Sequence, residues 1–218
     1  FLRRCKVIAA INSYISASNL SPVERQGFSP MNTITENTFV TADHHFGHRN
    51  ILLYEPCRCI ECGIDNSLYE RGKIPEKDII KADNEWIRRW NEVVKVDDEV
   101  LHLGDFSFWG FEETINILAL LNGNISLLLG SHDSRSRCEK IYQAGYFKQI
   151  YQGPFKQVIN GIEIVFSHEP MKEMDPNNLN IHGHTHSKST DNPNQICVSI
   201  EQTNFAPIRI STILERMK

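Results

Sequence analysis

The amino-acid sequence has no long uninterrupted run of apolar residues. Its apolar segments, such as residues 125–129, are far shorter than the roughly 20 residues that a helix needs to cross a bilayer. The apolar patch at residues 7–11, which follows Arg3 and Arg4, is also shorter than the usual core of a secretory signal. We therefore expect no transmembrane helix, no signal peptide and a cytoplasmic location.

An excess of charge of one sign is also missing. The formal net charge is -4 at pH 7, 23% of the residues are charged, and no basic tract is present. This balance provides no non-specific grip for a phosphate backbone, so charge does not indicate nucleic acid as a partner, although it leaves that partner possible. Internal repeats and low-complexity tracts are absent too, and 218 residues suit one well-buried domain.

The chain has six cysteines, and three of them lie close together in CRCIEC as Cys57, Cys59 and Cys62. Three thiols at this spacing could supply most of a tetrahedral zinc site, with a fourth ligand from elsewhere. We favour a reduced surface loop, because a structural zinc site normally needs four ligands. A disulfide within the triplet would be expected only in an exported protein.

Short apolar runs that end in polar residues alternate with segments of helical periodicity. Strands are predicted within residues 37–43, 98–105, 124–133, 162–170 and 179–186. Helices are predicted within residues 75–95, 111–124 and 134–144, with Trp86 and Trp90 packing on the sheet. This alternation indicates an α/β domain, in which ligands bind at the carboxyl ends of the strands.

The domain itself is predicted to span residues 31–218, behind an N-terminal extension at residues 1–30. Residues 46–74 are expected to form a polar, irregular insertion that contains the cysteine triplet. Residues 187–195 are rich in turn-forming residues and are expected to form a surface loop.

Carboxylate and imidazole side chains follow each predicted strand. They are Asp43, His45, Asp105, His132, Asp133, His168, His184 and His186. A mixed set of oxygen and nitrogen ligands suits zinc, manganese or iron better than calcium or magnesium. The sequence therefore predicts a metal site, with room for two ions, at the strand ends.

These residues form ordered blocks: D-x-H at Asp43, G-D at Asp105, G-S-H-D at residues 130–133, a lone His168, and G-H-x-H at residues 183–186. The series resembles the calcineurin-like metallophosphoesterase family, in particular its compact bacterial and phage-type single-domain members. The resemblance implies a four-layer α/β/β/α sandwich, with two facing mixed sheets flanked by helices. It also implies two divalent metal ions, either Mn²⁺, Fe²⁺/Fe³⁺ or Zn²⁺.

The same resemblance implies a role for each ligand. Asp43, His45 and His186 would hold the first metal, and Asp105 would bridge both. His168 and His184 would hold the second metal. Ser131 stands where the family has an asparagine ligand of the second metal, and its hydroxyl is on a shorter stem than an asparagine carbonyl.

The implied reaction is hydrolysis of a phosphodiester or phosphomonoester by in-line attack of a metal-bridging hydroxide. His132 would protonate the leaving group or stabilise the charge of the transition state, and Asp133 would orient its imidazole. A serine-nucleophile triad of Ser131, His132 and Asp133 is not expected, because adjacent side chains cannot easily align in series.

Two alternatives remain open at this stage. The substitution at Ser131 also fits a catalytically weakened domain of the same fold that serves as a binding or scaffold module. A nuclease is the other alternative, although the lack of a basic groove favours a small phosphate ester. The sequence does not indicate an oligomeric state.

Several polar residues outside the blocks have less specific interpretations. His102 and His182 lie within apolar strands and are predicted to be core histidines with satisfied hydrogen bonds. Arg135 and Arg137 are predicted to lie on a solvated helix face, with phosphate contact as the alternative. His48, just past the first block, could reach a substrate.

Overall fold

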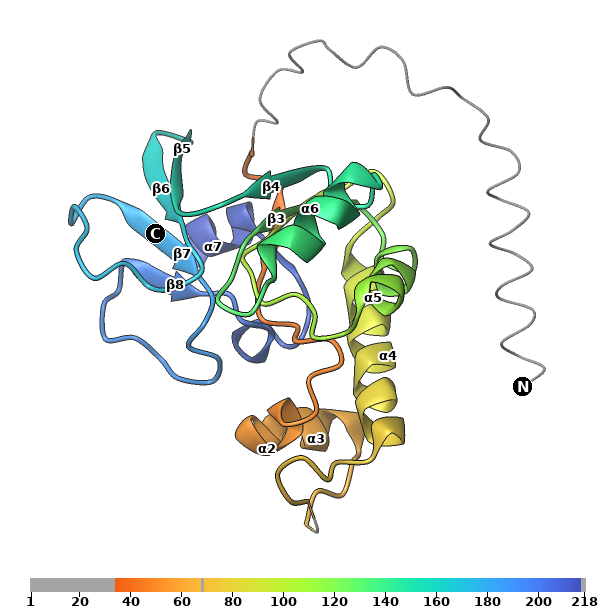
Figure 1. The fold of residues 1–218 in the computed structure, drawn as a ribbon. Coiled ribbons are helices and arrows are strands. Elements are labelled where there is room, and N and C mark those ends of the chain that lie inside the picture. Colours follow the sequence, from red (N-terminus) through yellow and green to blue (C-terminus); the bar gives the residue numbers. More distant parts are fainter. Residues whose placement is uncertain (1–33, 68, 217–218) are drawn as a thin grey trace, which may run out of the picture. The chain divides into compact units, whose positions relative to one another are not determined.

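The computed structural model describes residues 34–67 and 69–216, so the expected extension at residues 1–30 lies outside the described part. One sheet has five strands in the order β4-β3-β2-β1-β9 (Figure 1). Its strands are β1 (Phe39–Thr41), β2 (Glu99–His102), β3 (Asn124–Leu128), β4 (Gln149–Tyr151) and β9 (Ile208–Arg209). Strands β1 to β4 pair in parallel and β9 is antiparallel to β1, so this sheet is mixed.

The second sheet has four strands in the order β5-β6-β7-β8. They are β5 (Phe155–Ile159), β6 (Ile162–Phe166), β7 (Leu179–His182) and β8 (Gln195–Cys197). Asn160 and Gly161, with φ of 52° and 80°, form the two-residue turn of the antiparallel β5–β6 hairpin, for which Asn-Gly is a preferred sequence. Strands β6, β7 and β8 are parallel, so this sheet is mixed as well.

The two sheets share a hydrophobic core. Side chains of β1, β2 and β3 point alternately to opposite faces, so Val40, Leu101 and Leu128 join one apolar cluster with Phe166 and Ile181 of the second sheet. Helix α7 (Ile210–Arg216) adds Ile210, Ile213 and Leu214 to the same cluster. The prediction of an α/β fold with two facing mixed sheets flanked by helices is confirmed.

The other face of the five-stranded sheet is covered by α4 (Glu76–Val93), α5 (Phe111–Leu118) and α6 (Arg135–Gln143). All three were predicted from helical periodicity. Trp86 and Trp90 on α4 are buried in the cluster beneath these helices, and the Trp90 indole donates to the Asn122 carbonyl at 2.8 Å. Their predicted packing role is confirmed.

The segment between β1 and α4 differs from the prediction of a polar, irregular insertion with surface cysteines. It contains α2 (Ile51–Tyr54) and α3 (Pro56–Cys62), and Cys59 and Cys62 are only 1% and 8% exposed. Helix α3 begins with a proline and ends at Gly63 in the left-handed region, which are ordinary helix start and stop signals. Cys59 and Cys62 are buried in the apolar cluster that includes α4, whereas Ile60 is exposed, and the segment was read wrongly as loop.

Cysteine chemistry is not apparent in the described chain. Cys57, Cys59, Cys62, Cys138 and Cys197 form no disulfide there. The groups of three metal-ligating side chains found among residues 34–67 and 69–216 contain no cysteine, so the zinc alternative gains no support.

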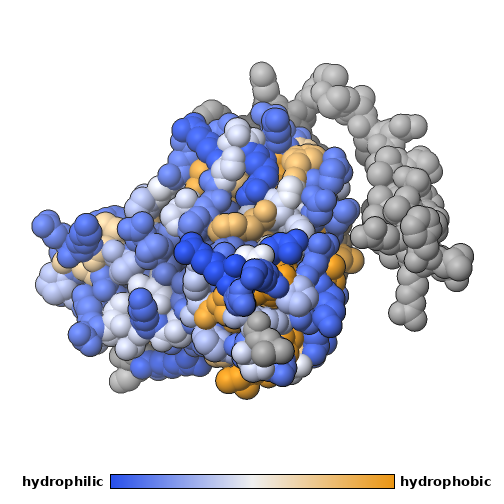
Figure 2. Space-filling model, turned by 60° about the horizontal axis from the view of Figure 1, so that its bottom comes forward, coloured by the Kyte–Doolittle hydropathy of each residue, from blue (hydrophilic) through white to orange (hydrophobic). Residues whose placement is uncertain are grey.

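The surface offers few extended apolar areas. In Figure 2, apolar side chains form small areas that are interrupted by hydrophilic ones. Exposed apolar residues such as Ile60 and Val96 are distributed over different elements. None of the described helices is both long and apolar enough to span a membrane.

Candidate metal centre

The predicted ligands lie where the chain leaves β1, β2, β3, β6 and β7. Five of them have a left-handed backbone, with φ of 60° for Asp43, 53° for His45, 55° for Asp105, 69° for His184 and 51° for His186. Non-glycine residues seldom adopt this conformation, and it concentrates at functional sites. Backbone hydrogen bonds from Asp43 to Gly104 (3.0 Å) and from His45 to Asp105 (3.0 Å) hold the first two turns together.

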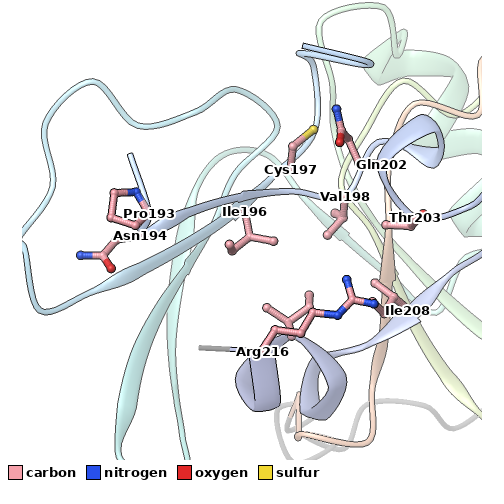
Figure 3. A pocket seen from close by; sticks show the side chains of 10 residues that line it. Pro193, Asn194, Ile196, Cys197, Val198, Gln202, Thr203, Ile208 and Arg216 are labelled. Carbon is pink, nitrogen blue, oxygen red and sulfur yellow. The ribbon is translucent and has the colours of Figure 1, made fainter. Parts of the chain in front are cut away.

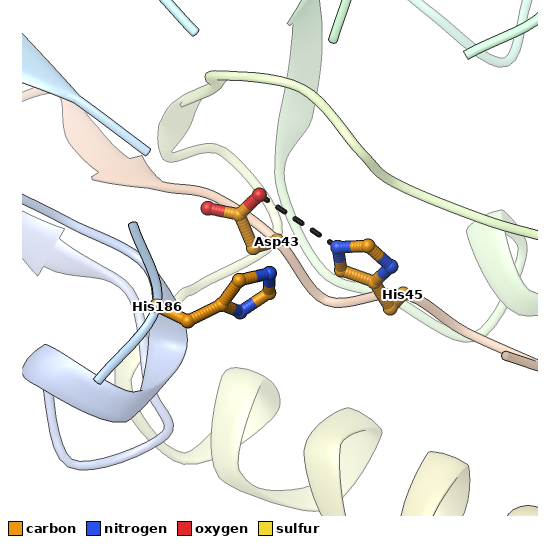
Figure 4. A group of neighbouring side chains, drawn as sticks. All are labelled: Asp43, His45 and His186. Atoms are coloured by element: carbon orange, nitrogen blue, oxygen red, sulfur yellow. Dashed lines mark ion pairs between the residues drawn. The ribbon is translucent and has the colours of Figure 1, made fainter. Parts of the chain in front are cut away.

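Asp43, His45 and His186 form the first group of potential ligands (Figure 4). Asp43 Oδ2 accepts hydrogen bonds from the His184 backbone N–H (2.7 Å) and the Ser199 hydroxyl (2.6 Å). Asp43 Oδ1 is buried without a hydrogen-bond partner in the described chain and lies 3.8 Å from His45 Nε2. A buried oxygen and a buried imidazole nitrogen without hydrogen bonds are atoms that a bound cation would satisfy.

Asp43, Asp105 and His168 form the second group, so Asp43 is shared between the two. His168 Nδ1 donates to the Leu103 carbonyl at 2.9 Å, which directs Nε2 toward Asp105 Oδ2 at 3.4 Å. The same Asp105 oxygen lies 3.5 Å from His45 Nε2. Two overlapping buried Asp/His clusters are thus present, and they can bind metal ions.

The other predicted site residues surround these clusters. The His184 ring is 5.1 Å from the His168 ring, centroid to centroid, and belongs to neither group. Ser131 Oγ is 3.3 Å from Asp105 Oδ2. His132 is exposed, and its ring centroid is 5.9 Å from that of His45. All the block residues are therefore close together, although His184 and Ser131 stand outside the tight groups.

Asp133 has a different environment from the one predicted. Its carboxylate accepts the backbone N–H groups of Asp105 (2.7 Å), Phe106 (3.1 Å) and Gly130 (3.0 Å). No hydrogen bond joins it to the His132 ring within the described residues. Asp133 instead fastens the turn after β3 to the turn after β2, while the backbone N–H of His132 donates to Asp105 Oδ1 at 2.8 Å.

Charge balance in the cluster depends on the close contact of acids and histidines. Burial raises the pKa of Asp43, but the nearby imidazoles of His45, His168 and His186 lower it by more, so the net shift is downward. Burial lowers the pKa of His168, yet the Asp105 carboxylate 3.4 Å away and the charge of Asp43 raise it to about 9. Protons on histidine thus balance the carboxylates, and cations would displace these protons.

Two residues that touch the predicted ligands were missed by the sequence analysis. Arg58 of α3 donates to the backbone carbonyl of Asp43 at 2.6 Å and of His44 at 2.8 Å. Glu201 of the 3₁₀ helix η1 (Ile200–Gln202) lies 3.1 Å from His186 Nδ1. The sequence signal that could have indicated Glu201 is the pair of polar residues Ser199 and Glu201, which follow the apolar segment at the end of β8.

The histidines within the strands are core residues. His102 Nδ1 accepts the Gly104 N–H at 3.2 Å, so its Nε2 carries the proton and donates to His44 Nδ1 at 2.9 Å. His182 Nδ1 bonds the Gly183 carbonyl at 2.7 Å, but its buried Nε2 has no partner in the described chain. The prediction of satisfied hydrogen bonds is therefore confirmed for His102 and only half met for His182.

The guanidinium groups of the two arginines after the third block are bound to other partners and not to the Asp/His clusters. Arg135 pairs with Glu139 at 2.9 Å on the exposed side of α6. Arg137 is half-buried and donates to the carbonyls of Ser107 (2.6 Å) and Trp109 (2.8 Å). Arg135 fits the predicted solvated face, whereas Arg137 is a structural donor.

Two stacked aromatic rings lie beside the first group of potential ligands. The Phe108 ring, 37% exposed, stacks on His48 at a centroid distance of 4.0 Å and lies 5.1 Å from the His132 ring. Burial lowers the pKa of His48 to about 4, so this imidazole is neutral at pH 7. His48 lies next to the first group, with its ring centroid 5.3 Å from that of His45.

Hollows in the surface differ in their chemistry. One of about 700 Å³ is lined by Ser131 and His168 and continues past Met171 and Lys172. Another, of about 430 Å³, lies between β8, β9 and α7 (Figure 3). Among the described residues of its lining, Arg216 is the only charged side chain, and none of them belongs to the Asp/His clusters. Only the first hollow adjoins the candidate metal centre.

Comparisons with known proteins identify relatives without establishing a family. No family model matches the chain. The uncharacterized protein MJ1445 of Methanocaldococcus jannaschii is 28% identical over 188 residues, which cover 81% of this chain and 89% of that protein. The crystal structure of AQ665 from Aquifex aeolicus, a protein of unknown function, has a TM-score of 0.59 at 24% identity, covering 82% of this chain and 98% of that one.

A second solved structure, described as a novel archaeal phosphodiesterase, has a TM-score of 0.38 at 17% identity. It covers 74% of this chain and 81% of that one. The similarity to AQ665 shows a common fold over most of the described domain.

Proposed function

We propose that this chain is a dinuclear-metal-dependent phosphoesterase of the calcineurin-like kind. The observation that carries the proposal is the pair of overlapping Asp/His groups that share Asp43. Asp43 Oδ1, His45 Nε2 and His168 Nε2 are all buried without hydrogen-bond partners in the described chain. Unpartnered buried polar atoms are costly, and cations would satisfy all three.

The residues present fit two divalent ions. Asp43, His45 and His186 would hold the first ion, and Asp105 would contact both, since its Oδ2 lies within 3.5 Å of a histidine nitrogen from each group. His168 would hold the second ion, together with His184 and with Ser131 as a weak or water-linked ligand. Nitrogen and carboxylate donors of this mixture suit Mn²⁺, iron or Zn²⁺.

The chemistry that two such ions would supply at these residues is activation of a water molecule and neutralisation of charge on the phosphoryl oxygens. The protein's own contribution is positioning and proton transfer. His132 is exposed beside the cluster, where its imidazole can protonate the oxygen of the leaving group. Asp133 acts on this residue indirectly, by holding the turns after β2 and β3 together.

A small phosphodiester or phosphomonoester is the proposed substrate. The hollow beside Ser131 and His168 could take the remainder of the ester. Its charged lining residues are Glu169, Lys172 and Glu173, which do not form the basic track that a nucleic-acid backbone requires. A nuclease is therefore the less favoured alternative.

Chelation followed by reloading tests the proposal. Protein stripped of metal, then supplied with Mn²⁺, Fe²⁺ or Zn²⁺, is expected to hydrolyse an aryl phosphate or a bis-aryl phosphodiester only in the reloaded state. The Asp105→Asn variant should lose most of this activity. Absence of metal-dependent hydrolysis of both substrates would refute the proposal, and metal binding without hydrolysis would favour the scaffold alternative. Cyclic nucleotides and single-stranded DNA, assayed side by side, would separate small-ester from nuclease activity.

A further inference from the structure

Arg58 is a fully buried arginine whose contacts all belong to the edge of the metal centre. Its Nη1 and Nη2 atoms donate to the His44 and Asp43 carbonyls at 2.8 and 2.6 Å. Its Nε and Nη2 atoms donate to Glu201 Oε1 at 2.8 and 2.5 Å. The guanidinium also lies 5.9 Å from the Trp86 ring, which closes the site behind it.

Glu201 connects this arginine to a predicted metal ligand. Its side chain is buried, and the Oε1 atom that accepts from Arg58 also lies 3.1 Å from His186 Nδ1. A carboxylate at Nδ1 keeps the proton on that nitrogen and leaves Nε2 free for a metal, which is how carboxylates usually orient metal-binding histidines. Arg58, Glu201 and His186 therefore form a continuous chain of contacts behind the first group.

An ion pair buried this deeply is not explained by stability alone. Removing two charges from water costs several kcal/mol per ion, and apolar replacements of buried pairs are often neutral or stabilising. This guanidinium donates to the carbonyl of Asp43, whose backbone is left-handed, and to the next carbonyl along the chain. Its N–H groups thus donate to a turn with left-handed backbone, and this turn carries the predicted ligand Asp43.

We propose that Arg58 and Glu201 are positioning residues of the first metal position, which rests on the function proposed above. Arg58 fixes the turn that carries Asp43 and His45, and Glu201 fixes the ring orientation and tautomer of His186. Helix α3 has a specific task in this arrangement. Its buried Cys59 and Cys62 hold the helix in the core. Arg58, on the same helix, therefore contacts both the turn after β1 and Glu201 on η1.

Metal titration of Glu201 variants tests this role without relying on activity. Metal-free wild-type, Glu201→Gln and Glu201→Leu proteins would be titrated with Mn²⁺ by calorimetry and by electron paramagnetic resonance. Loss of an outer carboxylate typically weakens a metal by about 10- to 100-fold. We expect that loss for one of two ions in Glu201→Leu, a smaller loss in Glu201→Gln, which keeps an acceptor oxygen, and an unchanged second ion.

Two further variants make the result specific. Glu99→Gln, which removes the charge of an exposed carboxylate paired with Lys148 at 2.7 Å, is the matched control and should bind both ions like the wild type. Arg58→Lys keeps the buried charge but lacks the planar fork, so one ammonium cannot replace all four donations. It should reproduce the selective loss of one ion.

The outcomes separate this inference from the proposed function. If the wild type binds no metal, the proposed function fails. If the wild type binds two ions and the Glu201 and Arg58 variants bind both with unchanged affinity, the positioning role is overturned while the proposed function stands. Equal weakening of both ions, or loss of the fold in Glu201→Gln as judged by its melting temperature without metal, would also overturn it, since either result indicates a merely structural pair.

Discussion

At the scale of single residues, the candidate metal centre combines left-handed backbone with buried polar atoms that lack hydrogen-bond partners in the described chain. Asp43 shows both features, because its φ is 60° and its Oδ1 accepts no hydrogen bond within the described residues. Its other oxygen is held by Ser199 and by the His184 backbone. The protein thus uses one carboxylate oxygen to fix the side chain and leaves the second to face the site.

Ser131 is the residue at which a single substitution should strengthen the site. Its hydroxyl is 3.3 Å from Asp105 Oδ2 and it borders the hollow beside His168. Asparagine would extend a carbonyl oxygen further toward the second ion. We expect Ser131→Asn to tighten the second metal and to raise hydrolysis several-fold, as measured by metal titration and by the rate on an aryl phosphate ester. Unchanged stoichiometry and rate would contradict a role for this position.

His102 should contribute to acid sensitivity. Burial lowers its pKa to about 3, against an ordinary value of 6.5. Between pH 6.5 and 3 the unfolded chain therefore binds a proton that the folded chain does not, so stability falls as the pH falls through this window. We expect the free energy of unfolding of His102→Leu to depend less on pH there, by up to about 1.4 kcal/mol per pH unit. Denaturant titrations of the metal-free proteins at several pH values measure this slope, and equal slopes would contradict it.

At the scale of elements, the turns after β2 and β3 are packed against each other too closely for an added methyl group. A Cβ atom at Gly130 would overlap the Asp105 backbone nitrogen and Oδ1. A Cβ atom at Gly104 would come within 2.6 Å of Gly130 Cα and 2.7 Å of His168 Nδ1. These glycines therefore let the turns after β2 and β3 lie in close contact, with the Asp105 carboxylate and the His168 ring beside them.

Gly130→Ala tests this close approach. The methyl group should displace Asp105, weaken both ions and destabilise the fold by about 1–3 kcal/mol, the usual cost of overpacking. Calorimetric metal titration and thermal unfolding measure these effects. Gly153→Ala is the matched control, because a Cβ atom there would meet nothing within 4 Å. Similar metal affinities in the two variants would show that the turns can separate without harm.

Several elements were not predictable from local sequence. Strands β4, β8 and β9 have only two or three residues each, too few for periodicity to be read, and they exist because a neighbouring strand supplies their hydrogen bonds. Helices α2 and α3 were hidden by the polar residues between their buried positions. Strand β5, with five residues, and helix α7 were not predicted either. Strands β1, β2, β3, β6 and β7 and helices α4, α5 and α6 were predicted, since each lies within a longer apolar or amphipathic run.

At the scale of the whole molecule, the candidate metal centre draws its residues from both sheets. Asp43, His45 and Asp105 follow strands of the five-stranded sheet, whereas His168, His184 and His186 follow strands of the four-stranded sheet. Ions held by ligands from both sheets would therefore link the two halves of the core. Because a ligand that binds only the folded state stabilises it, metal should raise the melting temperature of the entire domain.

Thermal unfolding with and without chelator measures this link. At a free metal concentration of 100 Kd, one site should add about 2.7 kcal/mol to the free energy of unfolding. Asp43→Asn, which alters the residue shared by both ligand groups, should remove most of the increase. A melting temperature that is the same in the chelated and reloaded wild type would argue against ions that connect the sheets.

The sequence by itself determined the α/β fold, the main helices and strands, and the candidate ligands, because each strand is followed directly by the residues that it presents. Only the tertiary structure brought Arg58 to Glu201, which lies 143 residues away along the chain, and both to the back of His186. Only it assigned Asp133 to backbone amides and the cysteine helix to the core. Such contacts depend on how elements that are far apart in the sequence pack together, and a local pattern of residue types does not encode that packing.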